Sequence, residues 1–402
     1  MKRICFVVLG LYINLLGAYA QTNDSAKYKS RRLKLDEVNL VSSYYKQDGN
    51  NSAVTGGVGT EKLKDFSNGL EVKFLRYNKK KRKENIDVNL GIDYYTSASS
   101  DKIDPSSISS ASKEDLRIYP SITRTVINEK KGSAVLTNLS YSHESDYRSY
   151  GIAAGVSQKS KDNTAEFTAR AQLYLDVVKI ILPIELRNSS TGGVTGAPNQ
   201  YDYPWKHRNT VSGSFTFSKI ITQRFHLMWL LDVAYQQGFL GLPFHRIYFR
   251  DRTLATEKLP SSRFKIPFAM RAGYFLGDKI IFRGSYRFYK DDWGLQANTA
   301  EIETSFKATT FLSVSPFYRY YTQNGVDYFA GFEQHLKTES YYTSNYDLSK
   351  FNSHFFGAGL RYAPPKGLFG HKHLNMIEVR YGHYKRSNGL HADIISLNLK
   401  YK

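Results

Sequence analysis

The most regular feature of this sequence is a strict alternation of apolar and polar positions. In Ile86–Tyr95, which reads IDVNLGIDYY, Ile, Val, Leu, Ile and Tyr alternate with Asp, Asn, Gly, Asp and Tyr. The same period of two continues through Glu166–Val177 and Phe225–Gln236. A period of two places apolar side chains on one face of a β-strand and polar side chains on the other. The pattern therefore predicts strands with one apolar face.

These alternating segments are long for a soluble protein. Strands in soluble sheets usually have about five or six residues, whereas a tilted strand needs about 9–11 to cross a bilayer. Length therefore favours membrane-spanning strands over a soluble β-sandwich or solenoid, which is the alternative. The strands are expected near residues 38–47, 64–77, 86–97, 115–129, 134–145, 150–160, 165–178, 209–218, 225–236, 262–275, 279–289, 297–307, 312–323, 351–363, 376–385 and 391–402.

The connections between these strands alternate in length. Long or polar connections fall at 48–63, 98–114, 179–208, 237–261 and 324–350, and compact ones at 130–133, 161–164, 219–224, 276–278 and 308–311. Residues 144–149 and 290–296 are compact exceptions among the first set. Outer-membrane barrels have short periplasmic turns and long extracellular loops, with an even number of strands. The sequence thus places both termini in the periplasm.

The predicted fold is all-β, a transmembrane antiparallel up-and-down β-barrel of about 16 strands. Lipid cannot satisfy the free backbone groups of a sheet edge, so a membrane-spanning sheet must close on itself. Barrels of 14 or 18 strands are also compatible with the pattern. No run reaches the roughly eighteen apolar residues of a membrane helix, which excludes a helical membrane protein.

The N-terminus has the features of a secretory signal. Met1–Arg3 is positively charged, Ile4–Leu16 is apolar, and Ala18-Tyr19-Ala20 is a cleavage motif. We therefore expect export to the cell outer membrane of a Gram-negative bacterium, with cleavage after Ala20. Cys5 lies inside this signal, so no disulfide or thiolate chemistry is expected in the mature chain.

Three regions follow from these patterns. Residues 1–20 are the expected signal peptide, residues 21–36 a polar periplasmic tail, and residues 37–402 the outer-membrane β-barrel. The whole chain has a formal charge of +20, and removing Lys2 and Arg3 leaves +18. A positive charge of this size suggests nucleic acid or anionic lipid as a binding partner. Export argues against nucleic acid, so outer-membrane lipid and lipopolysaccharide are the expected partners.

Several segments resemble an uncharacterised family of outer-membrane barrels, domain of unknown function 3570. They are VNLVSSYYKQDGNNSAVTGGVGTEKL (38–63), LPSSRFKIPFAMRAGYFLGDK (259–279), YRFYKDDWGLQANTAEIE (286–303), SVSPFYRYYTQNGVDYF (313–329) and YYTSNYDLS (341–349). The resemblance implies an outer-membrane barrel and no known activity. It also implies an envelope redox protein as one partner. The outer-membrane insertion machinery is another expected partner, although Lys402 follows Tyr401 where many such barrels end in an aromatic residue.

The hairpin 279–307 predicts charged residues on the lumen wall. Pairing about residues 290–296 places Arg283 opposite Glu303. It also places Arg287 diagonal to Glu301. The residues expected to line the pore as an interior charge ladder are Arg263, Lys265, Arg271, Arg283, Arg287, Glu301, Glu303 and Arg319. Rings of basic side chains favour anions in pores, but such charges can also simply pair and fill a narrow lumen.

Other motifs predict no catalytic, metal or cofactor site. Asp291-Asp292-Trp293 is expected to form a turn with Trp293 at the membrane interface, and paired tyrosines such as Tyr44-Tyr45 to form an aromatic girdle. Gly56–Thr60 lacks the Lys-Ser/Thr ending of a phosphate loop. His371 and His373 lack the further ligands of a metal site. No nucleophile elbow occurs, so an enzyme is not expected.

Two functions are compatible with these predictions. The first is a porin-like pore with a basic lumen for small, anionic solutes, since sixteen strands can enclose an aqueous channel. The alternative is a non-conducting envelope scaffold that binds partners through its long outer loops or sheathes an envelope redox component.

Overall fold

The computed structural model describes residues 32–96, 114–186 and 203–402. The expected signal peptide, its cleavage site and most of the tail 21–36 lie outside the described residues, as do most of the connection 98–114 and part of 179–208. No helix among the described residues is long and apolar enough to span a membrane.

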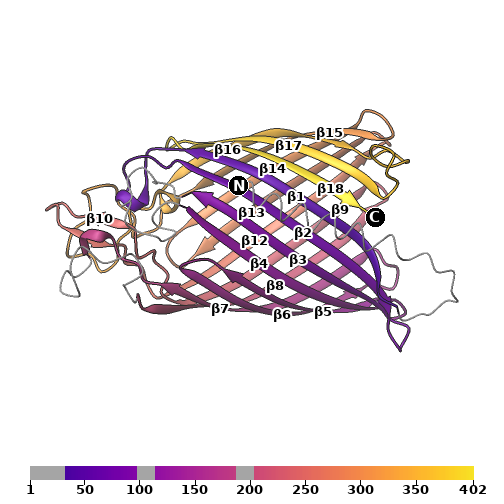
Figure 1. Ribbon diagram of the computed structural model, residues 1–402, viewed down its shortest axis with the longest axis horizontal. Coiled ribbons are helices and arrows are strands. Elements are labelled where there is room, and N and C mark those ends of the chain that lie inside the picture. The colour runs from indigo at the N-terminus through magenta and orange to yellow at the C-terminus, as the bar shows by residue number, and fades with distance from the viewer. Residues whose placement is uncertain (1–31, 97–113, 187–202) are drawn as a thin grey trace.

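Sixteen long antiparallel strands form a closed barrel in the described part of the chain (Figure 1). The strands are β1 Lys34–Asp48, β2 Leu63–Tyr77, β3 Lys83–Thr96, β4 Glu114–Asn128, β5 Ser133–His143, β6 Tyr147–Lys159, β7 Ala165–Lys179, β8 Trp205–Thr222, β9 Phe225–Gly238, β12 Ser262–Leu276, β13 Ile280–Asp291, β14 Gln296–Lys307, β15 Leu312–Gln323, β16 Phe351–Tyr362, β17 Leu374–Arg386 and β18 His391–Tyr401. Neighbours in sequence pair in space, and β1 pairs with β18 to close the sheet. The predicted fold and strand number are confirmed.

Every expected strand is present, with ends that differ by up to four residues. The largest extension is in β8, where Trp205–Asn209 pairs with the end of β7 although its sequence does not alternate cleanly. Similarly, β1 begins at Lys34, so the last residues of the segment 21–36 are part of the barrel. Hydrogen bonding to an existing neighbour extends a strand beyond the residues whose pattern predicts it.

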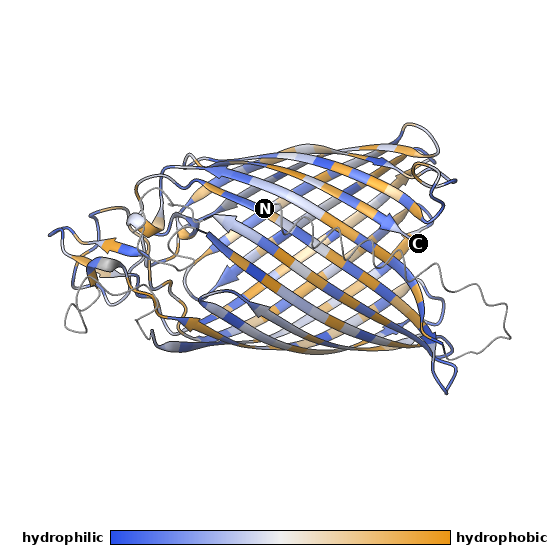
Figure 2. Cartoon of the chain, viewed as in Figure 1, coloured by the Kyte–Doolittle hydropathy of each residue, from blue (hydrophilic) through white to orange (hydrophobic). Residues whose placement is uncertain are grey.

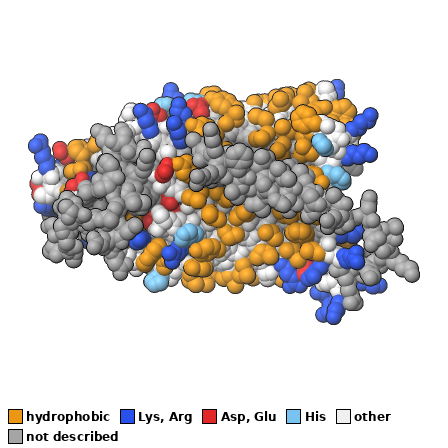
Figure 3. All heavy atoms as spheres, viewed as in Figure 1, with side chains coloured by type: hydrophobic (Ala, Val, Ile, Leu, Met, Phe, Trp, Pro, Cys, Tyr) orange, Lys and Arg blue, Asp and Glu red, His pale blue; other side chains and the backbone are white. Residues whose placement is uncertain are grey.

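The two faces of the sheet differ as the alternation predicts. Apolar side chains such as Val135, Ile152 and Val211 are more than half exposed on the outside, where lipid would cover them. Figure 2 shows apolar and polar residues alternating along the strands, and Figure 3 shows the resulting apolar belt. Adjacent tyrosines divide between the faces. Tyr44 is 40% exposed outside, whereas Tyr45 points inward and donates to Gln47, so only one of the pair belongs to an outer girdle.

The two ends of the barrel are unlike each other. One end carries short turns, which we call the turn end, and the turn between β2 and β3 there contains Lys79-Lys80-Lys81-Arg82. The other end carries the long connections, which we call the loop end (Figure 1). These connections contain the short strands β10 Arg246–Tyr248 and β11 Leu254–Thr256 and the 3-10 helices η1 Ala53–Thr55, η2 Ile184–Leu186 and η4 Tyr346–Leu348.

The connections at the loop end pack into one folded unit, which we call the cap and define as residues 49–62, 239–261, 292–295 and 324–350. Backbone bridges join Phe249 to His335 and Lys258 to Tyr342 between two of these segments. Ile247 at the centre of the cap has no exposed surface. The sequence predicts long loops here, and the structure shows that they have a core of their own.

Trp293 corrects one prediction from the sequence. It is only 3% exposed and does not lie at the membrane interface. Its indole Nε1 donates to the carbonyl oxygen of Ser262 at 2.9 Å, and its ring packs edge-on against Tyr328 of the cap. The tight connection turns Trp293 over the barrel mouth, where cap residues exclude water. Asp291 is the last residue of β13 and Asp292 begins the turn, and both accept hydrogen bonds from backbone N–H groups.

The lumen wall as candidate functional site

The inward faces of β12 to β17 form a wall of aligned side chains, which we call the charged wall. Strand register sets Arg271, Ser285, Glu301 and Arg319 side by side in one row. The next row towards the loop end contains Ala269, Arg287, Thr299 and Tyr321. Because the side-chain period is two, every second residue of each strand joins this wall.

One carboxylate on the charged wall joins three strands. Glu303 lies opposite Arg283 in the register, and the two side chains form an ion pair with a 2.9 Å N–O distance. The other oxygen of Glu303 accepts from Arg380 of β17 at 2.7 Å. Arg380 reaches it by lying across Phe317, with the guanidinium 5.0 Å from the ring centre. Sequence analysis did not identify Arg380, although its position on the polar face of 376–385 was a signal.

Glu301 also forms an ion pair, but its partner is not Arg287, the arginine diagonal to it in the predicted hairpin. It accepts from Nε of Arg319 at 2.8 Å. Arg287 lies diagonal to Glu301, and among the described residues neither Arg287 nor Arg271 has a hydrogen bond or ion pair. The predicted ladder therefore consists of paired charges and of two exposed arginines, Arg271 and Arg287, that have no carboxylate partner among the described residues.

Arg263 and Lys265 lie nearer the cap than the other predicted residues. Arg263 forms an ion pair with the fully buried carboxylate of Asp291 and stacks 4.2 Å from the ring centre of Trp293. The carboxylate of Asp291 also accepts from Tyr289 and from the backbone of Leu295. Lys265 is half-buried opposite Asp291 in the register. This cluster joins the barrel to the cap rather than lining an open passage.

A cavity of about 550 Å³ lies between the charged wall and the cap. Its charged lining consists of Arg271, Arg287, Arg319, Arg386, Glu301 and Asp347. Asp347 belongs to η4 in the cap, and its carboxylate forms an ion pair with Arg386 of β17 at 2.5 Å. Gln323 holds this part of the cap by donating to the carbonyl oxygens of Asp347 and Ser349. No periodic signal marks Asp347, so sequence reasoning missed it.

The cap spans the mouth of the barrel. Strands β1 and β9 lie on opposite sides of the ring, yet the connections that follow them meet. Arg246 of β10 donates to the carbonyl oxygen of Val54 in η1 at 2.8 Å, and it forms an ion pair with Glu185 at 2.9 Å. A solute that enters from the loop end must therefore pass around the cap.

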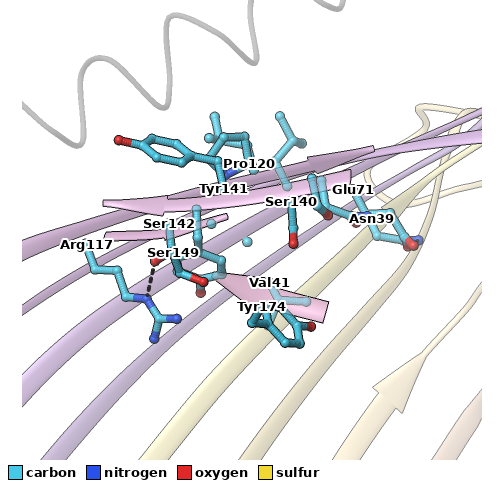
Figure 4. A pocket seen from close by; sticks show the side chains of 17 residues that line it. Asn39, Val41, Glu71, Arg117, Pro120, Ser140, Tyr141, Ser142, Ser149 and Tyr174 are labelled. Carbon is cyan, nitrogen blue, oxygen red and sulfur yellow. Dashed lines mark hydrogen bonds between the residues drawn. The ribbon is translucent and has the colours of Figure 1, made fainter. Parts of the chain in front are cut away.

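The opposite wall, formed by β1 to β7, has a different lining. It borders a second cavity of about 520 Å³, whose lining includes the small residues Gly69, Ser140 and Ser149 and the larger Glu71, Arg117, Tyr119 and Tyr174. Figure 4 shows Arg117 bonded to Ser142 at this cavity, and the distance from Nε to Oγ is 3.0 Å. We call this surface the small-residue wall.

An acidic group lies beside the small-residue wall at the loop end. Ligand atoms of Asp115, Glu144 and Asp146 lie within 4.8 Å of one another. Burial raises the pKa of Glu144, and the neighbouring carboxylates add to this shift. Tyr95 donates to Glu144, and Ser145 donates to Asp115. These bonds explain the cluster without an ion, and we assign no metal to it.

Comparison with known proteins places the chain in a family. Residues 111–389 match the model of the family described as "Protein of unknown function (DUF3570)", so the chain belongs to that family. The predicted resemblance is confirmed. No curated protein matches the sequence.

Solved structures with a similar fold are outer-membrane barrels of low sequence identity. OccK1 (OpdK) of Pseudomonas aeruginosa gives a TM-score of 0.42 at 10% identity, covering 92% of this chain and 98% of that one. A BenF-like porin from Pseudomonas fluorescens Pf-5 gives 0.41 at 10% identity, covering 91% and 98%. A deletion mutant of the monoaromatic hydrocarbon channel TodX gives 0.41 at 10% identity, covering 93% and 90%.

Proposed function

We propose that this protein is a porin-like pore of the outer membrane that favours small anionic solutes. The observation that supports this proposal is the excess of positive charge on the charged wall. Glu301 and Glu303 are already paired there, whereas Arg271 and Arg287 have no acidic partner among the described residues. Exposed basic side chains in a pore attract anions and repel cations.

The position in the membrane follows from the same architecture. An apolar belt on a closed barrel is compatible with lipid, and short turns at one end are typical of the periplasmic side. The long connections would then face the outside, where lipopolysaccharide and external solutes are the partners. Export through a signal peptide cleaved after Ala20 remains part of this proposal.

Single-channel recording tests the proposal directly. The full barrel, refolded into a planar bilayer under a potassium chloride gradient, should conduct with a reversal potential on the anion side. Replacing Arg271 and Arg287 with serine (R271S/R287S) should shift that potential towards cation selectivity. These positions are better targets than Arg283, because its loss would remove one of the two partners of Glu303.

A matched control separates local from general effects of charge. Arg170 of β7 and Arg361 of β16 also lie on inward-facing positions but outside the cavity on the charged wall. R170S/R361S removes the same charge from elsewhere in the lumen, so an equal loss of anion preference in both variants would contradict a selective role for Arg271 and Arg287. Heat-modifiable mobility in detergent gels would show first that each variant folds.

A second function is favoured by the cap. Because connections from opposite sides of the barrel meet across the mouth, the protein could be a closed scaffold that binds an envelope partner, including a redox protein. A folded barrel that never conducts would support the scaffold and contradict the pore.

A further inference from the structure

We propose that the cavity between the charged wall and the cap is a binding site for a compact organic anion, with a carboxylate or phosphate group held by Arg271 and Arg287. This inference rests on the proposed pore, because it names the class of solute that the pore would select. The cavity of about 550 Å³ falls within the usual size range of small-molecule sites, roughly 300–1,000 Å³.

The two arginines are placed to act on one group. Arg271 pairs with Ser285 in the register, and Arg287 lies two residues further along the same strand. Diagonal neighbours of this kind have Cα atoms roughly 7–8 Å apart, within reach of each other for long side chains. Two like charges at this spacing repel, and an anion between them relieves that repulsion. Guanidinium groups suit this task, because they bind carboxylates and phosphates in a bidentate manner.

The residues directly paired with them on the neighbouring strands cannot neutralise them. Arg271 lies between Met228 and Ser285, and Arg287 lies between Ala269 and Thr299. None of these four residues carries a charge. Both acidic side chains of the cavity are already engaged, Glu301 with Arg319 and Asp347 with Arg386. The cavity therefore has two positive charges in excess.

The cap already places a carboxylate in this cavity. Asp347 contacts Arg386, whose guanidinium lies 4.5 Å from the ring centre of Phe351 and donates to the hydroxyl of Tyr384. The pair shows that the lining accommodates a carboxylate on an arginine backed by aromatic rings. Arg271 and Arg287 offer the same chemistry without an internal occupant.

The rest of the lining favours an organic ligand over a bare inorganic ion. Tyr321 and Tyr384 present half-buried aromatic rings, and Ser353 and Thr299 are small. Apolar surface with a few convergent polar groups is typical of sites for organic molecules. A planar carbon skeleton can lie on these rings while its acidic group contacts the arginines.

Isothermal titration calorimetry on the full chain, refolded in detergent micelles, tests this site without requiring conduction. The probes are benzoate and inorganic phosphate, which represent an organic carboxylate and the phosphate group alone. We expect saturable binding of benzoate, weakened about tenfold or more in R271S/R287S, since charge-assisted hydrogen bonds are the strong ones in such sites. R170S/R361S, which loses the same charge elsewhere in the lumen, should bind as the unmodified chain does.

Each outcome decides the inference. Loss of binding only in R271S/R287S supports it, and a preference for either probe identifies the recognised group. Absence of saturable binding of both probes, or equal weakening in both variants, overturns it. Conductance of the same preparations separates this result from the proposed pore. A conducting, anion-selective barrel without binding keeps the pore and refutes the site, whereas binding by a silent barrel supports the site and refutes the pore.

Discussion

The charged wall and the small-residue wall face each other across one lumen, and different residues make each of them polar. Both are the inward faces of alternating strands, so both must be polar. On the charged wall long arginines bridge strands, as Arg380 does when it reaches Glu303 from β17 to β14. On the small-residue wall Glu37 of β1 likewise pairs with Lys73 and Lys400 on the two neighbouring strands. At the cavity itself, however, Gly69 and Ser140 leave space. The fold requires a polar inner face but does not specify which polar residues form it.

The cap is attached unequally to these two walls. It arises mainly from connections flanking the charged wall, and Asp291 and Asp347 tie it there through ion pairs with arginines. On the other side, segment 49–62 follows β1, and the hydrogen bond from Arg246 to Val54 joins this segment to the rest of the cap. The comparison teaches that charge on one wall anchors the unit that covers the mouth, in addition to the attraction of anions that we propose.

The largest expected effect follows from breaking the anchor on the charged wall. In D291N, Arg263 loses its carboxylate partner in a buried environment, where removal of one member of an ion pair costs about 3–5 kcal/mol. Denaturant unfolding in lipid vesicles should show a lower free energy of unfolding. E129Q, in the exposed turn between β4 and β5, is the control and should change stability little. A stable D291N would contradict the anchoring role.

Two glycines, Gly357 of the charged wall and Gly69 of the small-residue wall, should respond differently to the same substitution. A Cβ atom at Gly357 would lie 2.0 Å from the carbonyl oxygen of Tyr381, whereas a Cβ atom at Gly69 would have nothing within 4 Å. We therefore expect G357A to destabilise the barrel by about 1–3 kcal/mol, as overpacking does. G69A should change stability by about 0.5 kcal/mol or less. Equal effects in the same unfolding assay would contradict a difference in packing between these two positions.

The bond that joins segment 49–62 to the rest of the cap can be removed separately. R246A deletes the hydrogen bond to Val54 and the ion pair with Glu185, which is half-exposed and so contributes about 1 kcal/mol or less. We expect faster proteolysis of residues 49–62 and more frequent conductance fluctuations, with the barrel intact. R252A, whose pairing with Glu333 spans 3.8 Å and is largely exposed, should leave both unchanged.

The smallest expected effect is a change of local stability with pH, which should have opposite directions at Glu257 in the cap and at Glu144 beside the small-residue wall. Burial raises the pKa of Glu257 in the cap, but His245 and hydrogen bonds from Thr343 and Leu242 outweigh it and hold the pKa below its usual value. Its contribution to stability is therefore present above the ordinary carboxyl pKa and is lost as pH falls through the lowered one. Glu144 has a raised pKa, so its ionisation destabilises the folded state and acidification relieves this.

Hydrogen exchange measured between pH 7 and pH 3 tests whether acidification destabilises the cap around Glu257 and stabilises the region around Glu144. Protection of residues 239–261 should fall as the solution becomes acidic, whereas protection around residues 144–146 should hold or rise. E257Q should remove most of the pH dependence of the cap. A cap equally protected across this range, in both the unmodified chain and E257Q, would contradict the role of Glu257.

The alternation of side chains explains why so much of the barrel could be predicted. Strand faces follow from single residues at a period of two, and the hairpin 279–307 could be paired because its connection is short. Arg283 thus lies opposite Glu303 at the predicted register. Trp293 was misplaced because aromatic residues near strand ends usually mark the membrane interface, whereas here the cap buries it.

The sequence by itself predicted a closed antiparallel barrel of about sixteen strands, its two faces and the pairing of Arg283 with Glu303 in one hairpin. Only the tertiary structure decided which other charges on the charged wall are paired, that Arg386 meets Asp347, and that the long connections form a cap across the mouth. The physical reason is the separation along the chain of the residues that interact. Alternation acts between neighbouring residues and paired strands, whereas closure and loop packing join residues far apart in the chain, whose contacts leave no periodic signal.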